Sequence, residues 1–371
     1  MDFDFSDDQE QLRDAVRRWV DKGYSFERRT AISKAGGFSA DAYRELAALG
    51  LCGLYVPEHL SGMGMGPVEG MVVMEELGRG LVLEPVAQAL MAGAVLSAFA
   101  PEALAQTWLP RVAGGDALVM LAHQERSSRY RLSPCATRAD GAAGAWTVTG
   151  AKSVVNLGDQ AHAFLVPAML GDSVALFLVQ RQGPGVTTRG YGMLDGGHAA
   201  ELTLDHAPAE LLTADGLDAL DYAADVGIAC LCAEAVGVMD KTVLITADYM
   251  NTRKQFGVAI SSFQALRHRV ADMKMQLELA RSMSYYASLK LHLPAPERRA
   301  ATARAKYQLG NSMRFIGQQA IQLHGGIGVT DEYILGHYVK RLTQMEMSFG
   351  DSLHHLGIVS DSMQDCAGVF V

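Results

Sequence analysis

Two short stretches of this sequence carry residue types suited to binding a large anionic molecule. The first spans residues 249–257, where cations, amides, an aromatic ring and a glycine lie between two helical patterns: Asn251, Arg253, Lys254, Gln255, Phe256 and Gly257. The second follows another helical pattern and contains Gly325 and Gly326. A guanidinium binds phosphate through paired hydrogen bonds, and glycines let backbone N–H groups approach a phosphate closely. The two stretches therefore predict a large anionic cofactor held between helix ends.

The composition excludes several classes of protein. Of the 371 residues, 49% are hydrophobic and 20% are charged, which indicates a folded chain with a large core. The net charge is −9 and there is no basic block, which argues against a nucleic-acid partner. The acidic segment at residues 1–5 has no apolar signal core, and no apolar run reaches membrane-spanning length. We therefore expect a soluble, cytoplasmic protein with no membrane partner.

The cysteines are scattered along the chain. Cys230 and Cys232 are too close together for a usual zinc pair, and no set of histidines or cysteines completes such a site. We therefore expect no metal site. Instead, we expect buried thiols in a reducing setting at all five positions: Cys52, Cys135, Cys230, Cys232 and Cys366.

The hydrophobic patterns predict three domains. Residues 1–115 have helical periodicity and form an N-terminal helical domain. Residues 116–215 hold several short strand-like runs separated by turn residues, which predicts a small β-barrel or sandwich. The predicted strands lie at residues 117–122, 146–150, 163–167, 174–179, 185–188 and 200–204. Residues 216–371 are helical again and predict a C-terminal four-helix bundle. The expected fold class is α+β and mostly α.

Some local patterns in these domains make more specific predictions. Ser39 precedes a helical run that Gly50 ends, so Ser39 is predicted to be a helix N-cap. Small residues recur over residues 226–237, which predicts close contact between helices. Apolar residues recur at spacings of 3 and 4 over residues 263–280, which predicts the seam of the bundle.

Two motifs in the C-terminal part of the chain are specific: Arg253-Lys254-Gln255-Phe256-Gly257 and Gln322-Leu323-His324-Gly325-Gly326-Ile327-Gly328. Together with the order of helical domain, barrel and bundle, they resemble the acyl-CoA dehydrogenase family over nearly the whole chain. The resemblance implies FAD as the cofactor, with Arg253 and the backbone of the glycine loop on its pyrophosphate. It implies further cofactor contacts from four side chains: Gln255, Phe256, Gln264 and Gln322. In the family, the contacts of the residues that correspond to Arg253 and Gln264 reach the FAD of a neighbouring subunit, which implies at least a dimer.

Two segments of the expected barrel depart from the family pattern. The family's Thr-Glu-Pro segment corresponds to residues 122–128 here, which keep Glu125 but lack the proline and the later Gly-Ser-Asp. The family's Gly-x-Lys-x-Trp-Ile-Thr-Asn-Gly segment corresponds to residues 150–158. Val154 replaces its tryptophan, and Asn156 replaces its threonine. Because asparagine can donate or accept hydrogen bonds, Asn156 is expected to contact the flavin from this altered wall.

The catalytic base is expected near the end of the chain. Dehydrogenation beside a thioester needs a carboxylate to take the α-proton while the flavin takes the β-hydride. The family's Tyr-Glu-Gly-Thr segment corresponds to residues 349–352, where Gly350 holds the glutamate position and Asp351 follows it. The other location that some members use falls near Gly227, which has no carboxylate. Asp351 is therefore the predicted base, and the alternative is that it caps a following helix. Ser352 keeps the hydroxyl that the family's threonine offers to the flavin.

The segments at residues 1–6 and 349–351 resemble those of small subunits of heteromeric acyl-CoA dehydrogenases, such as the pimeloyl-CoA dehydrogenase small subunit and steroid-degrading relatives. The resemblance implies FAD-dependent α,β-dehydrogenation of an acyl-CoA thioester by a homo- or hetero-oligomer that contains a sister chain. Electrons would pass to an electron-transfer flavoprotein. Two alternatives are a non-catalytic partner subunit that completes the sister chain's site and an acyl-CoA oxidase. Dicarboxylic, branched and steroid acyl groups all remain open.

Overall fold

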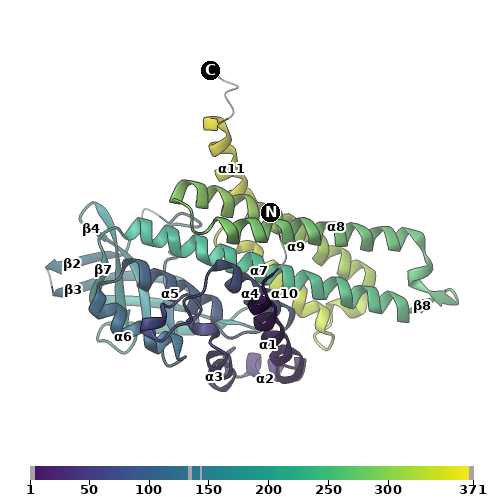
Figure 1. Cartoon of the computed structure of the whole chain (residues 1–371), viewed down its shortest axis with the longest axis horizontal. Helices are drawn as coiled ribbons and strands as arrows, with labels where there is room; N and C mark the ends of the chain where they lie inside the picture. Colours follow the sequence, from purple (N-terminus) through teal and green to yellow (C-terminus); the bar gives the residue numbers. More distant parts are fainter. Residues whose placement is uncertain (1–4, 133–135, 143, 367–371) are drawn as a thin grey trace. The chain divides into compact units, whose positions relative to one another are not determined.

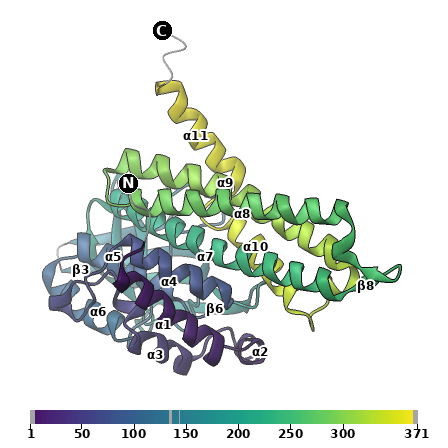
Figure 2. The same ribbon diagram turned by 45° about the vertical axis from the view of Figure 1, so that its right-hand side comes forward.

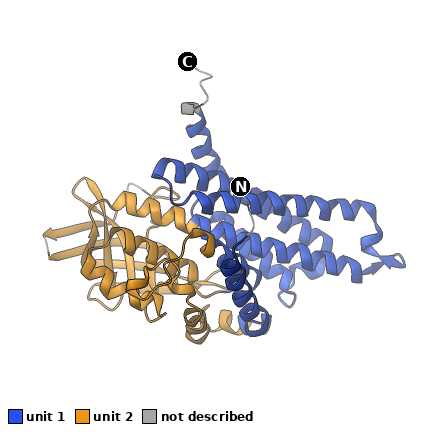
Figure 3. Ribbon diagram, viewed as in Figure 1, with its two compact units in different colours: residues 1–29, 71–82, 228–371 blue, residues 30–70, 83–227 orange. Residues whose placement is uncertain are grey.

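The computed structural model describes residues 5–132, 136–142 and 144–366, with side chains up to residue 363. Cys135, the first four residues and the side chain of Cys366 therefore lie outside the described part. The chain divides into two compact units (Figure 3). Unit 1 comprises residues 1–29, 71–82 and 228–371, and unit 2 comprises residues 30–70 and 83–227. The three predicted domains, which follow chain order, stay a prediction.

Unit 1 is built from helices (Figures 1 and 2). They are α1 (Asp7–Gly23), α4 (Pro67–Arg79), α7 (Gly216–Thr252), α8 (Gln264–Lys290), α9 (Ala295–His324), α10 (Ile334–Met347) and α11 (Ser352–Cys366). The first residues of α4 and α7 belong to unit 2. Short 3-10 helices are η3 (Ile260–Ser262) and η4 (Gly325–Val329). Helices α7 to α10 share one apolar core. Helix α11 extends away from the other helices of the unit in both views.

The two helical patterns predicted for the bundle are present. On α8, Met273, Leu277 and Ala280 are fully buried in the core shared with α7, α9 and α10. On α7, a Cβ added at Gly237 would lie 1.8 Å from the Glu75 carbonyl oxygen of α4. The backbones of α4 and α7 therefore touch at this point, which only a residue without a side chain permits. The small-residue stripe is confirmed, and the seam is confirmed from Leu266 onward. The predicted start of the seam at Phe263 is wrong, because this residue precedes α8 and is 37% exposed.

Unit 2 contains the β-barrel. Its strands are β1 (Val119–Leu121), β2 (Arg138–Ala142), β3 (Ala145–Asn156), β4 (Ala163–Leu170), β5 (Ser173–Gln180), β6 (Val186–Gly192) and β7 (His198–Thr213). The strands β4-β2-β3-β7-β5 form a closed ring, because β5 pairs with both β7 and β4. The other two strands pair with members of the ring, β1 with β4 and β6 with β7. The sequence predicted all of these strands except β2. Its pattern was missed because only Ala139 of its five residues is buried.

The α-helices of unit 2 are α3 (Ala40–Ala48), α5 (Val86–Phe99) and α6 (Glu102–Ala113), and its 3-10 helices are η1 (Leu51–Gly53) and η2 (Glu58–Leu60). Helix α2 (Phe26–Lys34) begins in unit 1 and ends in unit 2. The hydroxyl of Ser39 accepts a hydrogen bond from the Ala42 N–H at 3.2 Å, which confirms the predicted N-cap of α3. Free thiols are buried at Cys52, Cys230 and Cys232. Within the described residues, no helix combines the length and the apolar character that crossing a membrane requires.

Candidate active site

The structure brings the two predicted cofactor-binding stretches together at one end of the unit 1 bundle. The ring of Tyr249 stacks on that of His324, with centroids 4.3 Å apart, and the Tyr249 hydroxyl donates to the His324 carbonyl oxygen at 3.3 Å. Arg253 follows Tyr249 by one helical turn, and Gly325 follows His324 directly. The contact therefore fixes the distance between the two stretches. We call this region, residues 249–264 and 322–326, the hairpin end.

A two-stranded hairpin follows α7 at the hairpin end (Figure 1). It is formed by β8 (Lys254–Gln255) and β9 (Val258–Ala259). The connecting residues, Phe256 and Gly257, have φ values of 53° and 79°. Two left-handed residues are typical of a type I′ turn, and such a turn matches the twist of a tight hairpin. Phe256 is 91% exposed, so its ring adds little to the core of its own unit and is available to another molecule.

The residues at the hairpin end fit the pyrophosphate of FAD. The Arg253 guanidinium makes no hydrogen bond or ion pair with any residue that the structure describes. A Cβ added at Gly325 or Gly326 would meet no atom within 4 Å. An exposed guanidinium and the open backbone N–H groups of a glycine-rich segment can both donate hydrogen bonds to a phosphate. Arg253, Gly325 and Gly326 are exposed at this end. The side chains of Gln255, Gln264 and Gln322 are exposed there as well.

The predicted base lies elsewhere in unit 1, at the α10–α11 turn (residues 348–352). The Asp351 Oδ1 atom accepts a hydrogen bond from the His354 N–H at 2.8 Å, so Asp351 caps α11. Ser352 is buried, and its backbone N–H and its hydroxyl both donate to Oε1 of Glu346, at 2.9 and 2.7 Å. The capping contact of Asp351 is therefore present, and its role as base stays a prediction. The Ser352 hydroxyl is engaged within the chain, and its predicted contact with the flavin likewise stays a prediction.

The position of the family's glutamate is crowded in this chain. Gly350 has a φ of 106° and follows Phe349, whose φ is 56°. A Cβ added at Gly350 would lie 2.5 Å from His354 Cδ2 and 2.9 Å from His355 Nε2. The turn therefore cannot carry a side chain at position 350 without local rearrangement.

A lysine that is not among the predicted site residues holds this turn. Lys306 of α9 is fully buried, and its Nζ donates to the carbonyl oxygens of Glu346 and Gly350, both at 2.8 Å. Burial lowers the pKa of Lys306 to about 8. The sequence offered a signal, because an apolar seam at Leu309, Met313 and Ile316 extends back by three positions to this lysine.

The hairpin end and the α10–α11 turn are far apart in one chain. Gly310 of α9 faces Ser352, because a Cβ added there would lie 2.1 Å from the Ser352 Oγ. Gly325 comes fifteen residues later, directly after α9 ends. A helix rises 1.5 Å per residue, so the two places are about 22 Å apart along α9.

In unit 2, an ion pair joins the two barrel segments that depart from the family pattern. The Lys152 Nζ donates to Oε1 of Glu125 at 2.7 Å, and both side chains are buried. Glu125 also accepts the N–H groups of Ala136 and Thr137. Burial opposes ionisation of Glu125, but the hydrogen bonds from Lys152, Ala136 and Thr137 outweigh it and lower its pKa to about 2. The pair therefore fixes residue 125 against β3.

Strand β3 changes register just beyond this ion pair. Its pairing with β7 is irregular between Lys152 and Val155, and Val154 has a left-handed φ of 55°. Val154 is 41% exposed, and Asn156 is exposed at the end of the strand. The bulge thus turns Val154 outward at the place where the family carries tryptophan.

Comparisons with known proteins agree with this architecture. Models of the acyl-CoA dehydrogenase N-terminal and C-terminal domains match residues 6–116 and 214–364. YngJ of Bacillus subtilis, a probable acyl-CoA dehydrogenase, is 28% identical over 370 residues, which covers 95% of this chain and 97% of YngJ. Among solved structures, the steroid ACAD Tcur3481-Tcur3483 has a TM-score of 0.90 at 27% identity and covers 97% of this chain and 98% of that chain. The ChsE4-ChsE5 complex from Mycobacterium tuberculosis has a TM-score of 0.90 at 26% identity and covers 98% of this chain and 99% of that chain.

The chain belongs to the acyl-CoA dehydrogenase family. The predicted fold of helices, central β-barrel and C-terminal helices is confirmed. The predicted enzyme class, an oxidoreductase acting on CH–CH groups, and the FAD cofactor are confirmed at the level of the family.

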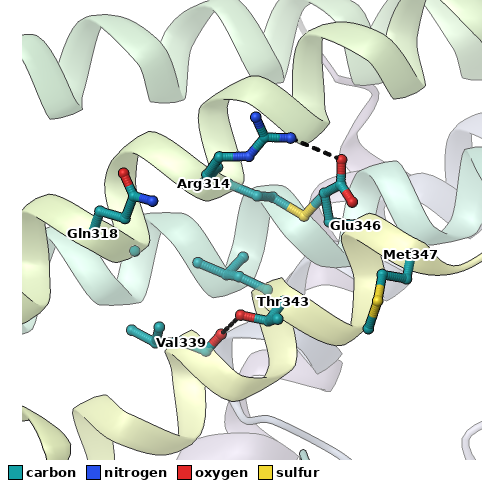
Figure 4. Close-up of a pocket in the computed structure, with 9 residues that line it drawn as sticks. Arg314, Gln318, Val339, Thr343, Glu346 and Met347 are labelled. Carbon is teal, nitrogen blue, oxygen red and sulfur yellow. Dashed lines mark hydrogen bonds and ion pairs between the residues drawn. The ribbon is translucent and has the colours of Figure 1, made fainter. Parts of the chain in front are cut away.

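This acyl-CoA dehydrogenase also has a pocket of about 310 Å³ between α9 and α10 (Figure 4). One wall carries the ion pair between Arg314 and Glu346, at 3.2 Å. Thr343 donates to the Val339 carbonyl oxygen at 2.9 Å, so its hydroxyl is satisfied within α10. None of the predicted site residues lines the pocket, but Glu346 connects it to the α10–α11 turn through Ser352.

Proposed function

We propose that this chain is one subunit of a heteromeric acyl-CoA dehydrogenase that carries out FAD-dependent α,β-dehydrogenation of an acyl-CoA thioester. The observation that carries the proposal is the separation of about 22 Å along α9 between the exposed hairpin end and the α10–α11 turn. Residues so far apart are suited to serving two different cofactor sites, each completed by another chain. Tcur3481-Tcur3483 and ChsE4-ChsE5 are both named as pairs of unlike chains.

In this proposal the hairpin end binds the nucleotide half of FAD. Arg253 neutralises the pyrophosphate, and the N–H groups of Gly325 and Gly326 donate to it. The remaining side chains at this end surround the nucleotide: Gln255, Phe256, Gln264 and Gln322. Asn156 contributes a polar group toward a flavin, whereas the Ser352 hydroxyl already donates to Glu346 Oε1 within its own unit. When bound, FAD supplies the acceptor for the β-hydride.

Asp351 is the proposed base that removes the α-proton of the thioester. Its position at the N-terminus of α11 suits a carboxylate, because the helix dipole and the free N–H groups there stabilise negative charge. Gly350, directly before it, has no side chain at the crowded position that carries glutamate in the family, so no other carboxylate competes with Asp351 there. The side chain of Asp351 is one methylene shorter than glutamate, so the substrate must approach the turn closely.

A second candidate function is a non-catalytic subunit that completes the site of a sister chain. Two observations favour it: the Asp351 carboxylate already accepts a capping hydrogen bond, and position 350 cannot take a side chain without rearrangement. In that case the sister chain would carry the base, and this chain would contribute its hairpin end.

Asp351→Asn separates the two candidates when it is made in the complex with the sister chain. Asparagine caps helices about as well as aspartate, so the fold and the FAD content should be kept. If Asp351 is the base, turnover falls by about 10²–10⁴-fold. Asp331→Asn, at an exposed aspartate of the same unit, is the matched control and should keep normal turnover. Near-normal turnover of Asp351→Asn would support the non-catalytic subunit instead.

We also propose a cytoplasmic enzyme that passes its electrons to an electron-transfer flavoprotein. Purified complex should reduce such a flavoprotein under anaerobic conditions when acyl-CoA is added. Rapid formation of hydrogen peroxide in air would point to an oxidase instead. A panel of dicarboxylic, branched and steroid acyl-CoA thioesters, compared by kcat/KM, would identify the acyl group.

A further inference from the structure

The α10–α11 turn has a backbone conformation that needs outside support. Phe349 and Gly350 both have left-handed φ values, 56° and 106°. This region is sterically disfavoured for a bulky residue such as phenylalanine. Such conformations persist where surrounding contacts determine them, and they are often found at functional sites.

Hydrogen bonds from two helices hold the carbonyl groups of this turn. His355 of α11 donates its Nε2–H to the Phe349 carbonyl oxygen at 2.9 Å and its backbone N–H to that of Asp351 at 3.1 Å. Lys306 of α9 donates to the Gly350 carbonyl oxygen at 2.8 Å. Three successive carbonyl groups are thus held, and only the bond to Gly350 comes from outside the turn and α11.

Lys306 also joins the turn to the end of α10. Its second hydrogen bond goes to the carbonyl oxygen of Glu346, in the last turn of α10, where a cation offsets the negative end of the helix. The charged or titratable groups that act on it are Cys232 on α7, the Glu346 carboxylate on α10, Asp351 in the turn and His355 on α11. Both of its hydrogen-bond acceptors are backbone carbonyls. A lysine buried on neutral acceptors is a poor way to stabilise a bundle, because its desolvation is only partly offset.

The same face of α9 supports the other side of the turn. Gly310 lies one helical turn after Lys306, and its missing side chain admits the Ser352 hydroxyl. Arg314 lies one turn further and pairs with Glu346, whose Oε1 atom accepts both hydrogen bonds from Ser352. Three residues at spacings of four thus contact the turn, directly or through Glu346.

We propose that this stripe of α9 positions the α10–α11 turn, and that Lys306 is the positioning residue that fixes where Asp351 presents its carboxylate. The proposal rests on the proposed function, in which Asp351 is the base. The link is direct, because the carbonyl group that Lys306 holds belongs to Gly350, the residue before Asp351. Loss of this bond lets the left-handed peptide rotate and moves the aspartate with it.

Lys306→Met tests the proposal in the FAD-loaded complex, because methionine fills similar space and removes the donors. We expect the backbone amides of residues 349–356 to exchange with deuterium faster, while those of residues 270–285 in α8 are unchanged. We expect kcat to fall by about 10- to 100-fold, as for a small misplacement of a catalytic group, with KM and FAD content kept. Lys274→Met removes an exposed lysine on α8 and is the matched control. It should change neither the deuterium exchange of residues 349–356 nor kcat.

Two results would overturn the proposal. One is unchanged exchange in the turn of a folded Lys306→Met protein, and the other is an unfolded protein, since Lys306 would then hold the bundle and not the turn. A failure of the proposed function is recognised separately. If Asp351→Asn keeps normal turnover while Lys306→Met still loosens the turn, the base assignment is wrong and the positioning of the turn stands.

Discussion

Gly350→Ala measures how tightly the α10–α11 turn is constrained. A left-handed conformation costs a residue with a side chain about 1–2 kcal/mol, and φ is 106° here. The new Cβ would lie 2.5 Å from His354 Cδ2, and overpacking of this kind costs about 1–3 kcal/mol. We therefore expect the free energy of unfolding to fall by about 2–5 kcal/mol, as measured by urea denaturation.

A double-mutant cycle separates the two contributions. His354→Ala removes the nearer of the two rings that the new methyl group would meet, so Gly350→Ala should cost less in that background. The left-handed strain of about 1–2 kcal/mol and the 2.9 Å approach to His355 Nε2 would remain. Gly350→Glu, which restores the family's carboxylate, should carry the full destabilisation and should not raise turnover. A loss below about 0.5 kcal/mol for Gly350→Ala would refute the reasoning, because changes of that size are typical of unconstrained surface positions.

Three further predictions concern other parts of the site. Arg253→Ala removes a charge-assisted contact worth roughly 1.5–3 kcal/mol, so FAD should bind about 10- to 150-fold more weakly in titrations of the apoprotein. Lys152→Met leaves the Glu125 carboxylate buried without its cation and should lower the free energy of unfolding by about 3–5 kcal/mol; adding Glu125→Gln should recover much of this loss. Burial lowers the pKa of His355 to about 3, so its contribution to stability is complete above pH 6.5 and is lost as the pH falls toward 3. Relative to His355→Asn, the wild-type protein should lose about 2 kcal/mol of unfolding free energy by pH 5 in urea denaturation.

Each of these predictions has an outcome that contradicts it. Wild-type affinity for FAD in Arg253→Ala would remove this arginine from the cofactor site. An additive double mutant at positions 125 and 152 would show that the two side chains do not interact. Equal acid sensitivity of the wild-type protein and His355→Asn would mean that His355 is not held in its neutral form.

The sequence alone determined the features that depend on local periodicity. The seam on α8 was visible because buried positions on a helix recur every three or four residues, and the Ser39 cap because capping involves neighbouring residues. The family was recognisable because each of its two motifs is a contiguous run of residues. Strand β2 was missed because it is mostly exposed and has no alternating pattern.

The tertiary structure decided which distant residues meet. Tyr249 and His324 are 75 positions apart, and their contact depends on how α7 and α9 pack. Lys306 appeared in the sequence as one charge on a helix, and only the fold places it on the Gly350 carbonyl, 44 positions away. A backbone carbonyl has the same chemistry in every residue, so the residue type at position 350 does not indicate that its carbonyl accepts a hydrogen bond from a lysine. The partner is set by the packing of whole helices, which is why the support of the α10–α11 turn became visible only in three dimensions.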